Sequence, residues 1–182
     1  FDSGKEVTER FTDKTINEIV KACFDMGAVK TGALIVVEQN IILSEYERTG
    51  ITLDSLITSQ LLINIFEHNT PLHDGAVIVR GNRIVAATCY LPLSDNMLLS
   101  KQLGTRHRAG VGISEVSDSL TIIVSEETGQ VSTAMNGKLK RNIDSDTLRT
   151  ELAKIQNKTH VDSKKLKQLL KGREKRERKI SE

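Results

Sequence analysis

The stretch that decides the fold is "PLHDGAVIVRGNRIVAATCYL", residues 71–91. It contains two runs rich in β-formers, 76–80 and 83–91, separated by Gly81-Asn82. A two-residue connection of this type is typical of a tight hairpin, so we expect the runs to pair as antiparallel strands. Residues 119–137 contain two further β-rich runs joined by Glu126 to Gly129, which predicts a second hairpin.

Helical spacing of apolar residues brackets these hairpins. It predicts helices over Glu9–Met26 (with Gly27 as the residue just past its end), Leu53–His68 (with Pro71 forbidding continuation) and Asp144–Gln156 (capped by Asp144 or Ser145). "GALIVVEQN", residues 32–40, is typical of a buried strand, and "SEYERTGITL", 44–53, of a loop or a short strand and turn. Ser94-Asp95 could open a short helix, and 105–117 could form another.

Helices placed before, between and after at least five strands favour an α/β (α+β) fold, in which helices flank a central mixed, largely antiparallel sheet. We expect one globular catalytic domain over residues 1–160 and a basic tail over 161–182. Residues 164–182 carry nine Lys and Arg against three Glu, although the whole chain has a net charge of only +2. This tail is interpreted as a solvated terminal helix, with binding to nucleic acid or an anionic membrane as the alternative.

Length and composition limit the class of protein. The 182 residues are 38% hydrophobic, enough for one domain with its own core. No apolar run reaches the roughly 18 residues of a membrane span, and the start of the chain does not resemble a signal peptide. The first residue is not Met, so we expect a piece of a longer protein. Cys23 and Cys89 lack CxxC spacing and are interpreted as core residues in a reducing, cytosolic compartment.

The first cluster with chemical potential is "HDGA", residues 73–76, at the entrance of a buried strand. His73 offers an imidazole and Asp74 a carboxylate, while Gly75 lets the backbone approach a ligand closely. The alternative is a loop in which Asp74 only shapes an Asx turn. Neither G-x-G-x-x-G nor a P-loop sequence is present, so the standard phosphate-binding loops do not apply.

The second cluster is "GTRHRAG", Gly104 to Gly110. Two guanidiniums flank an imidazole between glycines, and arginine grips phosphate oxygens through paired donors. If the segment begins a helix, its free amides add to the attraction for an anion. The alternative is a solvated basic face.

The third cluster is "VSEETG", residues 124–129, where Glu126 and Glu127 follow a buried strand. In isolation these two acids are most simply explained as exposed hairpin residues. Together with His73 or Asp74, one of them could hold a divalent cation that neutralises the phosphates gripped by the arginines.

Taken in order, "HDGAVIV", "LGTRHRAGVGISE" and "IIVSEETG" resemble the catalytic domain of the diadenylate cyclases, whose signatures are a DGA and an RHR motif. The resemblance covers roughly Phe11 to Leu139. The "YERTG" loop and the basic tail look most like the membrane-anchored CdaA class. No DNA-binding helix-hairpin-helix region follows, unlike in the DNA-scanning class.

The resemblance implies that two ATP molecules are condensed to cyclic di-AMP with release of two pyrophosphates, and that Mn²⁺, Mg²⁺ or Co²⁺ is required. In this interpretation Asp74 acts on the attacking 3′-hydroxyl, either accepting its proton or orienting it through metal. Gly75 and Ala76 let the nucleotide approach the backbone. His73, Asp74 and Glu127 are the metal ligands.

The same resemblance assigns the substrate contacts. Thr105, Arg106 and Arg108 hold the triphosphate, with Gly104 beside them and Ser125 adding a phosphate contact. His107 either contacts phosphate or packs. Tyr90 and Leu91 either sandwich the adenine or serve as core and rim residues.

One site that holds one ATP cannot close a symmetric ring, so an active homodimer with facing sites is expected. Attachment to the cytoplasmic face of the membrane would come from an N-terminal segment absent from this sequence, and regulatory protein partners are compatible with this picture. The alternatives are a module that senses ATP or cyclic di-AMP without turnover, and a metal-dependent phosphohydrolase. Nucleic-acid binding is not expected, because no aromatic residues interleave the tail charges.

Overall fold

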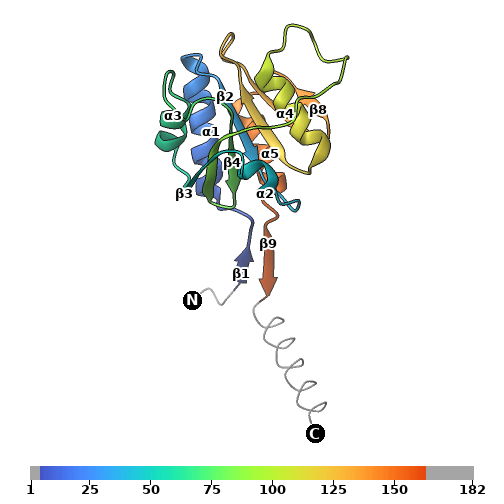
Figure 1. Cartoon of the computed structure of the whole chain (residues 1–182). Coiled ribbons are helices and arrows are strands. Elements are labelled where there is room, and N and C mark those ends of the chain that lie inside the picture. Colours follow the sequence, from blue (N-terminus) through green and yellow to red (C-terminus); the bar gives the residue numbers. More distant parts are fainter. Residues whose placement is uncertain (1–4, 163–182) are drawn as a thin grey trace.

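The computed structural model describes residues 5–162 and contains a seven-stranded sheet with helices on both faces (Figure 1). The strands of this sheet are β2 Ala33–Val37, β3 Ile51–Leu56, β4 Ala76–Arg80, β5 Arg83–Cys89, β6 Leu120–Val124, β7 Val131–Met135 and β8 Lys138–Lys140. Their order is β3-β5-β4-β2-β6-β7-β8. Strands β2 and β4 run parallel and the other neighbours antiparallel, which confirms the expected mixed, largely antiparallel sheet.

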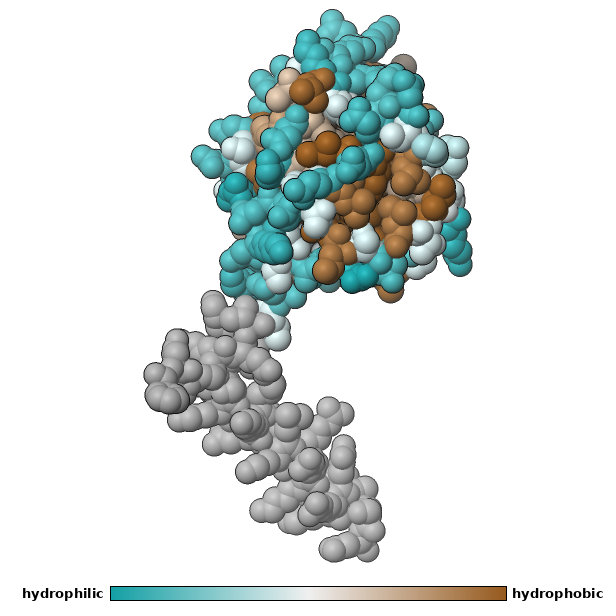
Figure 2. All heavy atoms as spheres, turned by 90° about the vertical axis from the view of Figure 1, so that its left-hand side faces the viewer, coloured by the Kyte–Doolittle hydropathy of each residue, from teal (hydrophilic) through white to brown (hydrophobic). Residues whose placement is uncertain are grey.

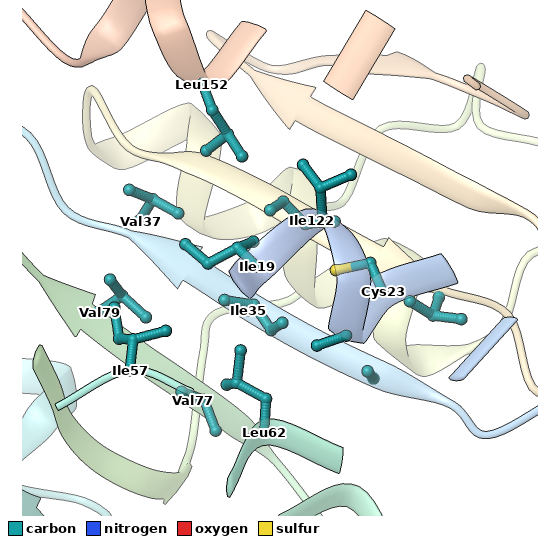
Figure 3. Close-up of a cluster of buried hydrophobic side chains, with 14 of the residues drawn as sticks. Ile19, Cys23, Ile35, Val37, Ile57, Leu62, Val77, Val79, Ile122 and Leu152 are labelled. Carbon is teal, nitrogen blue, oxygen red and sulfur yellow. The ribbon is translucent and has the colours of Figure 1, made fainter. Parts of the chain in front are cut away.

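The helices divide between the two faces of the sheet. They are α1 Asp13–Ala28, α2 Ser44–Glu47, α3 Ser59–Phe66, α4 Thr105–Val116 and α5 Ser145–Ile155. Helices α1, α3 and α5 share one hydrophobic cluster with the sheet, which Figure 3 shows between Ile19, Ile35, Leu62 and Leu152. Helix α4 packs on the other face, where Val111 joins Val36 and Ile78. Because β2 is covered on both faces, all five of its residues are buried and apolar.

Both predicted hairpins are confirmed. Strands β4 and β5 pair antiparallel around Gly81-Asn82, with Gly81 at a φ of +58° as a tight turn requires. Strands β6 and β7 pair in register from Thr121↔Ala134 to Val124↔Val131. Helix α5 begins after Asp144, whose side chain accepts a hydrogen bond from the amide of Thr147, so the expected cap is also confirmed. The buried positions of Cys23 and Cys89 agree with their interpretation as core residues.

Several local predictions are wrong. Helix α1 begins at Asp13 and not at Glu9, and residues 44–47 form α2 where a loop or a short strand and turn was expected. The second predicted helix begins at Ser59 and not at Leu53, because residues 51–56 form β3 and pair with β5. Gly27 lies inside α1 and not after its end. A glycine is needed here for packing, because a Cβ on Gly27 would lie 2.4 Å from the Gly129 carbonyl oxygen. The segment after Ser94 forms turns and no helix, since Ser94 instead binds the main chain of α4.

A separate two-stranded ribbon lies at one end of the molecule (Figure 1). It pairs β1 Lys5–Thr8 with β9 Thr159–Asp162, and the sequence pattern predicts neither strand. The basic tail predicted over 161–182 lies outside the described residues from 163 onward. Across the described part of the chain, the helices are too short or too polar to cross a membrane.

An apolar area is visible on the face that points left in Figure 1, where α3 and β3 lie (Figure 2). Both elements carry apolar side chains that are exposed or half-buried, among them Ile51, Leu56 and Leu61. The polar and charged clusters singled out in the sequence belong to other elements, so this apolar face is not where they meet.

Candidate active site

A cavity of about 620 Å³ opens at the edge of the sheet where β5 and β6 end and β4 begins. Four segments supply most of its lining: the residues before β4, the residues after β5, the first turn of α4, and the turn between β6 and β7. It brings together most of the predicted site, namely Asp74, Gly75, Tyr90, Leu91, Gly104, Thr105, Arg106, His107, Ser125 and Glu127. The three sequence clusters therefore meet in one place.

Asp74 is held at the cavity by the glycine that follows it. Gly75 has a φ of +87°, and a Cβ there would lie 2.9 Å from the Cys89 carbonyl oxygen. Side chains rarely adopt this conformation, so only glycine lets the chain turn here into β4. The first residue pair of the hairpin, Ala76↔Cys89, then sets Asp74 beside the end of β5.

The RHR motif forms the beginning of α4, as the anion-cradle interpretation requires. Gly104 is the N-cap residue with a φ of −82°, and no side chain caps the helix. The first turn contains no acidic residue, so its free amide groups and the helix dipole face the cavity without a competing negative charge from that turn. Thr105 and Arg106 stand on this turn and line the cavity. This is a site that attracts an anion.

Arg106 already has an anionic neighbour within the cavity. Its Nη1 lies 3.3 Å from Oε2 of Glu126, on the turn between β6 and β7. Its guanidinium also lies over the backbone of Gly32, where an added Cβ would come within 2.6 Å of Nη1. The guanidinium therefore bridges the start of β2 and the β6–β7 turn, and it must part from Glu126 or share its charge to bind a phosphate.

The surroundings of His107 disfavour the protonated form of its ring. Burial and the nearby cations of Arg141 and Arg106 lower the pKa of His107 from its ordinary value of 6.5, and the carboxylate of Glu127 opposes them. At neutral pH the ring is therefore uncharged, with one nitrogen that donates a hydrogen bond and one that accepts. The two roles considered for it, phosphate contact and packing, are both compatible with this state.

The turn that carries the acidic residues is shaped by Ser125. Its Oγ accepts hydrogen bonds from the amides of Glu127 and Thr128, both at 3.2 Å. The same turn packs on the end of α1 through the close contact of Gly27 and Gly129. Ser125 thus fixes the backbone from which Glu127 reaches the cavity, besides its predicted contact with phosphate.

The structure does not place three of the predicted residues in the cavity lining: His73, Ala76 and Arg108. His73 lies before Asp74 and its Nδ1 is 2.6 Å from the carbonyl oxygen of Thr70. Ala76 is fully buried within β4. Arg108 points to the carbonyl oxygen of Ser100, because residues two apart on a helix lie on different sides of it.

The sequence prediction missed part of the lining. The largest omission is Arg141, which follows β8 and adds a further guanidinium to the cavity. No motif surrounds it, and its proximity to His107 depends on how β8 pairs with β7. The other lining residues outside the prediction are Leu34, Cys89, Leu93, Gln102, Leu103, Ala109, Val124, Glu126, Thr128, Gln130 and Ser132.

Of the three carboxylates in the lining, that of Glu126 pairs with Arg106, and those of Asp74 and Glu127 remain to bind a divalent cation. Within residues 5–162, no three His, Cys, Asp or Glu side chains are grouped closely enough to hold a metal ion by themselves. Mg²⁺ is typically bound by one or two carboxylates together with the phosphates of its substrate, and not by a cage of protein ligands. The donor set therefore fits a cation whose coordination a bound nucleotide completes.

Comparison with known proteins identifies the family to which the chain is similar. Residues 20–139 match the DAC family model, described as "DisA bacterial checkpoint controller nucleotide-binding". The chain is 55% identical over 150 residues to the cyclic di-AMP synthase CdaA of Bacillus subtilis, covering 82% of this chain and 55% of that protein. It is 53% identical over 146 residues to a diadenylate cyclase of Listeria monocytogenes, covering 80% and 54%. The chain thus spans about half the length of these curated relatives.

Solved structures show the same architecture. DacA from Staphylococcus aureus, solved as a double mutant, superposes with a TM-score of 0.78 at 51% identity, covering 80% of this chain and 97% of that one. A hypothetical membrane spanning protein from Bacillus cereus gives a TM-score of 0.70 at 46% identity, covering 72% and 64%. Residues of both the DGA and RHR motifs line the cavity, and the chain belongs to the DAC family of diadenylate cyclase domains.

Proposed function

We propose that this chain catalyses the condensation of two ATP molecules into cyclic di-AMP, with release of two pyrophosphates. The observation that carries the proposal is that Asp74 and Arg106, from different motifs, line the same cavity. An acid that can act on a hydroxyl and a guanidinium that can hold a phosphate are thereby in reach of one nucleotide. The Bacillus subtilis and Listeria relatives, a cyclic di-AMP synthase and a diadenylate cyclase, support the same activity.

In each half-reaction a ribose 3′-hydroxyl oxygen attacks the α-phosphorus of the other ATP. The new P–O bond forms as the bond from the α-phosphorus to the bridging oxygen breaks, and pyrophosphate leaves with that electron pair. Asp74 accepts the hydroxyl proton or orients the hydroxyl. Thr105, Arg106 and the free amides of α4 hold the triphosphate and stabilise the charge that builds on the leaving pyrophosphate. Tyr90 and Leu91, which follow β5, would hold the adenine.

We assign the divalent cation, Mn²⁺, Mg²⁺ or Co²⁺, to Asp74 and Glu127. When bound it would neutralise phosphate charge and draw the reacting groups together. His73, the third ligand expected from the sequence, is left out of this assignment, because it lies outside the cavity lining with its Nδ1 2.6 Å from the Thr70 carbonyl oxygen.

The proposal includes a homodimer in which two cavities face one another. The cyclic product is symmetric, and each protomer supplies one ATP and receives the attack of the other. Tyr90 and Leu93 are exposed at the cavity, which leaves the rim open to such an approach. Attachment to the cytoplasmic face of a membrane, through a segment preceding this sequence, is part of the same proposal. Its support is the similarity to the Bacillus cereus protein, which is described as a hypothetical membrane spanning protein.

The test is incubation of the purified chain with ATP and Mn²⁺, followed by chromatographic separation of the products. Cyclic di-AMP and pyrophosphate are expected from the wild type and neither from Asp74→Asn, which should still bind ATP. The matched control is Asp25→Asn, an exposed aspartate on α1 that pairs with Lys21 and should leave the yield unchanged. AMP or ADP as the product would instead make the chain a phosphohydrolase, and ATP binding without turnover would make it a sensor.

A further inference from the structure

The segment at the end of β5 forms the nucleoside side of the cavity, although little strand pairing holds it in place. The last pairs of this strand are Ile51↔Ala87 on one side and Ala76↔Cys89 on the other. Tyr90 therefore begins beyond the ladder, and 75% of it is exposed to solvent. With its ring unburied, the place of Tyr90 depends on what fixes its main chain.

Thr49, in the short segment between α2 and β3, holds the main chain of Tyr90 in place. The amide of Tyr90 donates a hydrogen bond to Oγ1 of Thr49 at 2.8 Å. The same hydroxyl donates to the carbonyl oxygen of Tyr46 at 2.6 Å. Because the hydroxyl accepts one bond and donates the other, its orientation is set from both sides.

The segment that carries Thr49 is itself pressed against β5. A Cβ on Gly50 would lie 2.2 Å from the carbonyl oxygen of Ala87 and 2.6 Å from Sγ of Cys89, so only glycine permits this approach. The packing holds the neighbouring hydroxyl against the end of the strand.

Helix α2, which precedes Thr49, is fastened to the sheet by charge. It has only four residues, too few to be stable alone. Arg80, at the end of β4, binds Oε2 of Glu47 at 2.7 Å and both carboxylate oxygens of the buried Glu38 at 2.7 and 2.8 Å. Glu38 in turn accepts a hydrogen bond from the amide of Leu43, just before α2, at 2.9 Å. The anchor of Tyr90 is thus supported by the sheet.

We propose that Thr49 is a positioning residue for nucleotide binding: its hydroxyl fixes the main chain of Tyr90 so that the ring stands against the adenine. The inference rests on the proposed function, in which Tyr90 lies on the nucleoside side. It adds a residue outside the three sequence clusters. It also implies that the two sides of the cavity are positioned separately. The phosphate side is built on α4, and none of these hydrogen bonds connects α4 to Thr49.

The test compares Thr49→Val, which keeps the shape and loses the hydroxyl, with Thr49→Ser, which keeps the hydroxyl. Thr52→Val, an exposed threonine on β3 outside the cavity lining, is the matched control. Two probes are titrated with Mg²⁺ by calorimetry: 3′-deoxy-ATP, which lacks the attacking hydroxyl and cannot be cyclised, and inorganic tripolyphosphate, which lacks the nucleoside. Circular dichroism confirms that each variant is folded.

We expect Thr49→Val to raise the Kd for 3′-deoxy-ATP roughly threefold to tenfold, the effect of one lost hydrogen bond, and to leave tripolyphosphate binding unchanged. Thr49→Ser should restore most of the affinity. In turnover assays the KM for ATP should rise with little change in kcat, since the bond acts on binding and not on the transition state.

Equal affinity of Thr49→Val and wild type for 3′-deoxy-ATP would overturn the proposal. So would a parallel loss of tripolyphosphate binding, because the damage would then be general. A wild-type protein that binds 3′-deoxy-ATP but makes no cyclic di-AMP would refute the proposed function, while the comparison of the Thr49 variants would still decide this inference.

Discussion

Nη1 of Arg106 lies 3.3 Å from Oε2 of Glu126, so the guanidinium assigned to the triphosphate is paired with a carboxylate of its own chain. Phosphate must compete with that carboxylate for the same donors. The pair is partly open to water, with 62% of the Glu126 side chain exposed, so the competition is modest.

The first prediction concerns this competition. Glu126→Gln should tighten ATP binding by roughly twofold to fivefold, as expected when an exposed ion pair is removed. Glu45→Gln, an exposed glutamate on α2 outside the lining, should not change the affinity. Calorimetric titration with ATP and Mg²⁺ measures both. Weaker binding by Glu126→Gln would mean that Glu126 belongs with the cation and not opposite the phosphate.

A second prediction concerns the facing sites. If each product molecule needs two protomers, specific activity should fall as the enzyme is diluted below its dimer dissociation constant, and the rate should then vary with the square of enzyme concentration. Initial rates over a dilution series, with the oligomeric state followed by analytical ultracentrifugation, provide the measurement. Activity that stays linear in enzyme where the protein is strictly monomeric would contradict the facing dimer.

Two glycines at the cavity should respond differently to the same substitution. Gly75→Ala forces a side chain into a φ of +87° and against the Cys89 carbonyl oxygen, so it should lower the free energy of unfolding by about 1–3 kcal/mol. Gly104→Ala has an ordinary φ, and a Cβ there meets nothing within 4 Å, so it should cost only about 0.5 kcal/mol, because alanine is a poorer N-cap than glycine. Denaturant unfolding curves distinguish them. Equal losses in the two variants would show that the backbone before β4 is not as constrained as described.

The lowered pKa of His107 predicts a dependence of stability on pH. Below its ordinary value of 6.5, the unfolded chain binds a proton at this ring that the folded chain resists. Protonation then favours unfolding, so this contribution to stability is complete above pH 6.5 and is lost as the pH falls toward the lowered folded pKa. His107→Gln should therefore lose less stability than wild type between about pH 7 and 5, measured by urea unfolding at each pH. Parallel curves for the two proteins would refute this assignment.

The fifth prediction concerns the ion network beneath α2. Arg80→Met leaves Glu38, which is 5% exposed, without its main partner, and should cost about 2–3 kcal/mol. That is less than for a fully buried pair, because 40% of the Arg80 side chain reaches water. Arg83→Met removes an exposed pair with Asp54 and should cost at most about 1 kcal/mol. Thermal unfolding of both variants tests the contrast, and similar losses would show that the burial of Glu38 is not what matters.

The sequence could predict those parts of the fold that depend on neighbours along the chain. The β4–β5 hairpin follows from Gly81-Asn82 between two β-rich runs, and α5 follows from Asp144 ahead of an apolar stripe. Helix α2 could not be found in this way, because its four residues depend on Arg80 from a distant strand. The local pattern wrongly predicts helix over the second half of β3, since the pairing of β3 with β5 and the turn of its backbone at Asp54, where φ is +49°, are set by tertiary contacts.

The sequence could likewise predict only some residues of the candidate site. Asp74 and Arg106 stand in clusters whose composition points to chemistry, and both reach the cavity. Arg108 belongs to the same motif as Arg106, but the helical period turns it to the carbonyl oxygen of Ser100. Arg141 gave no local signal, and only the pairing of β7 with β8 brings it close to His107.

The ribbon of β1 and β9 lies at one end of the molecule, and the cavity opens at the other. The turn of the β4–β5 hairpin lies near the ribbon, where Asn82 binds Thr12, whereas Asp74 lies at the other end of β4. Figure 1 shows the ribbon of the two terminal strands at one end of the molecule. Because Asp74 lines the cavity, both strands leave from the end opposite its mouth. A fusion partner, affinity tag or surface linker joined beyond either strand would act as a handle at the far end, leaving the mouth free to meet nucleotide or a second protomer.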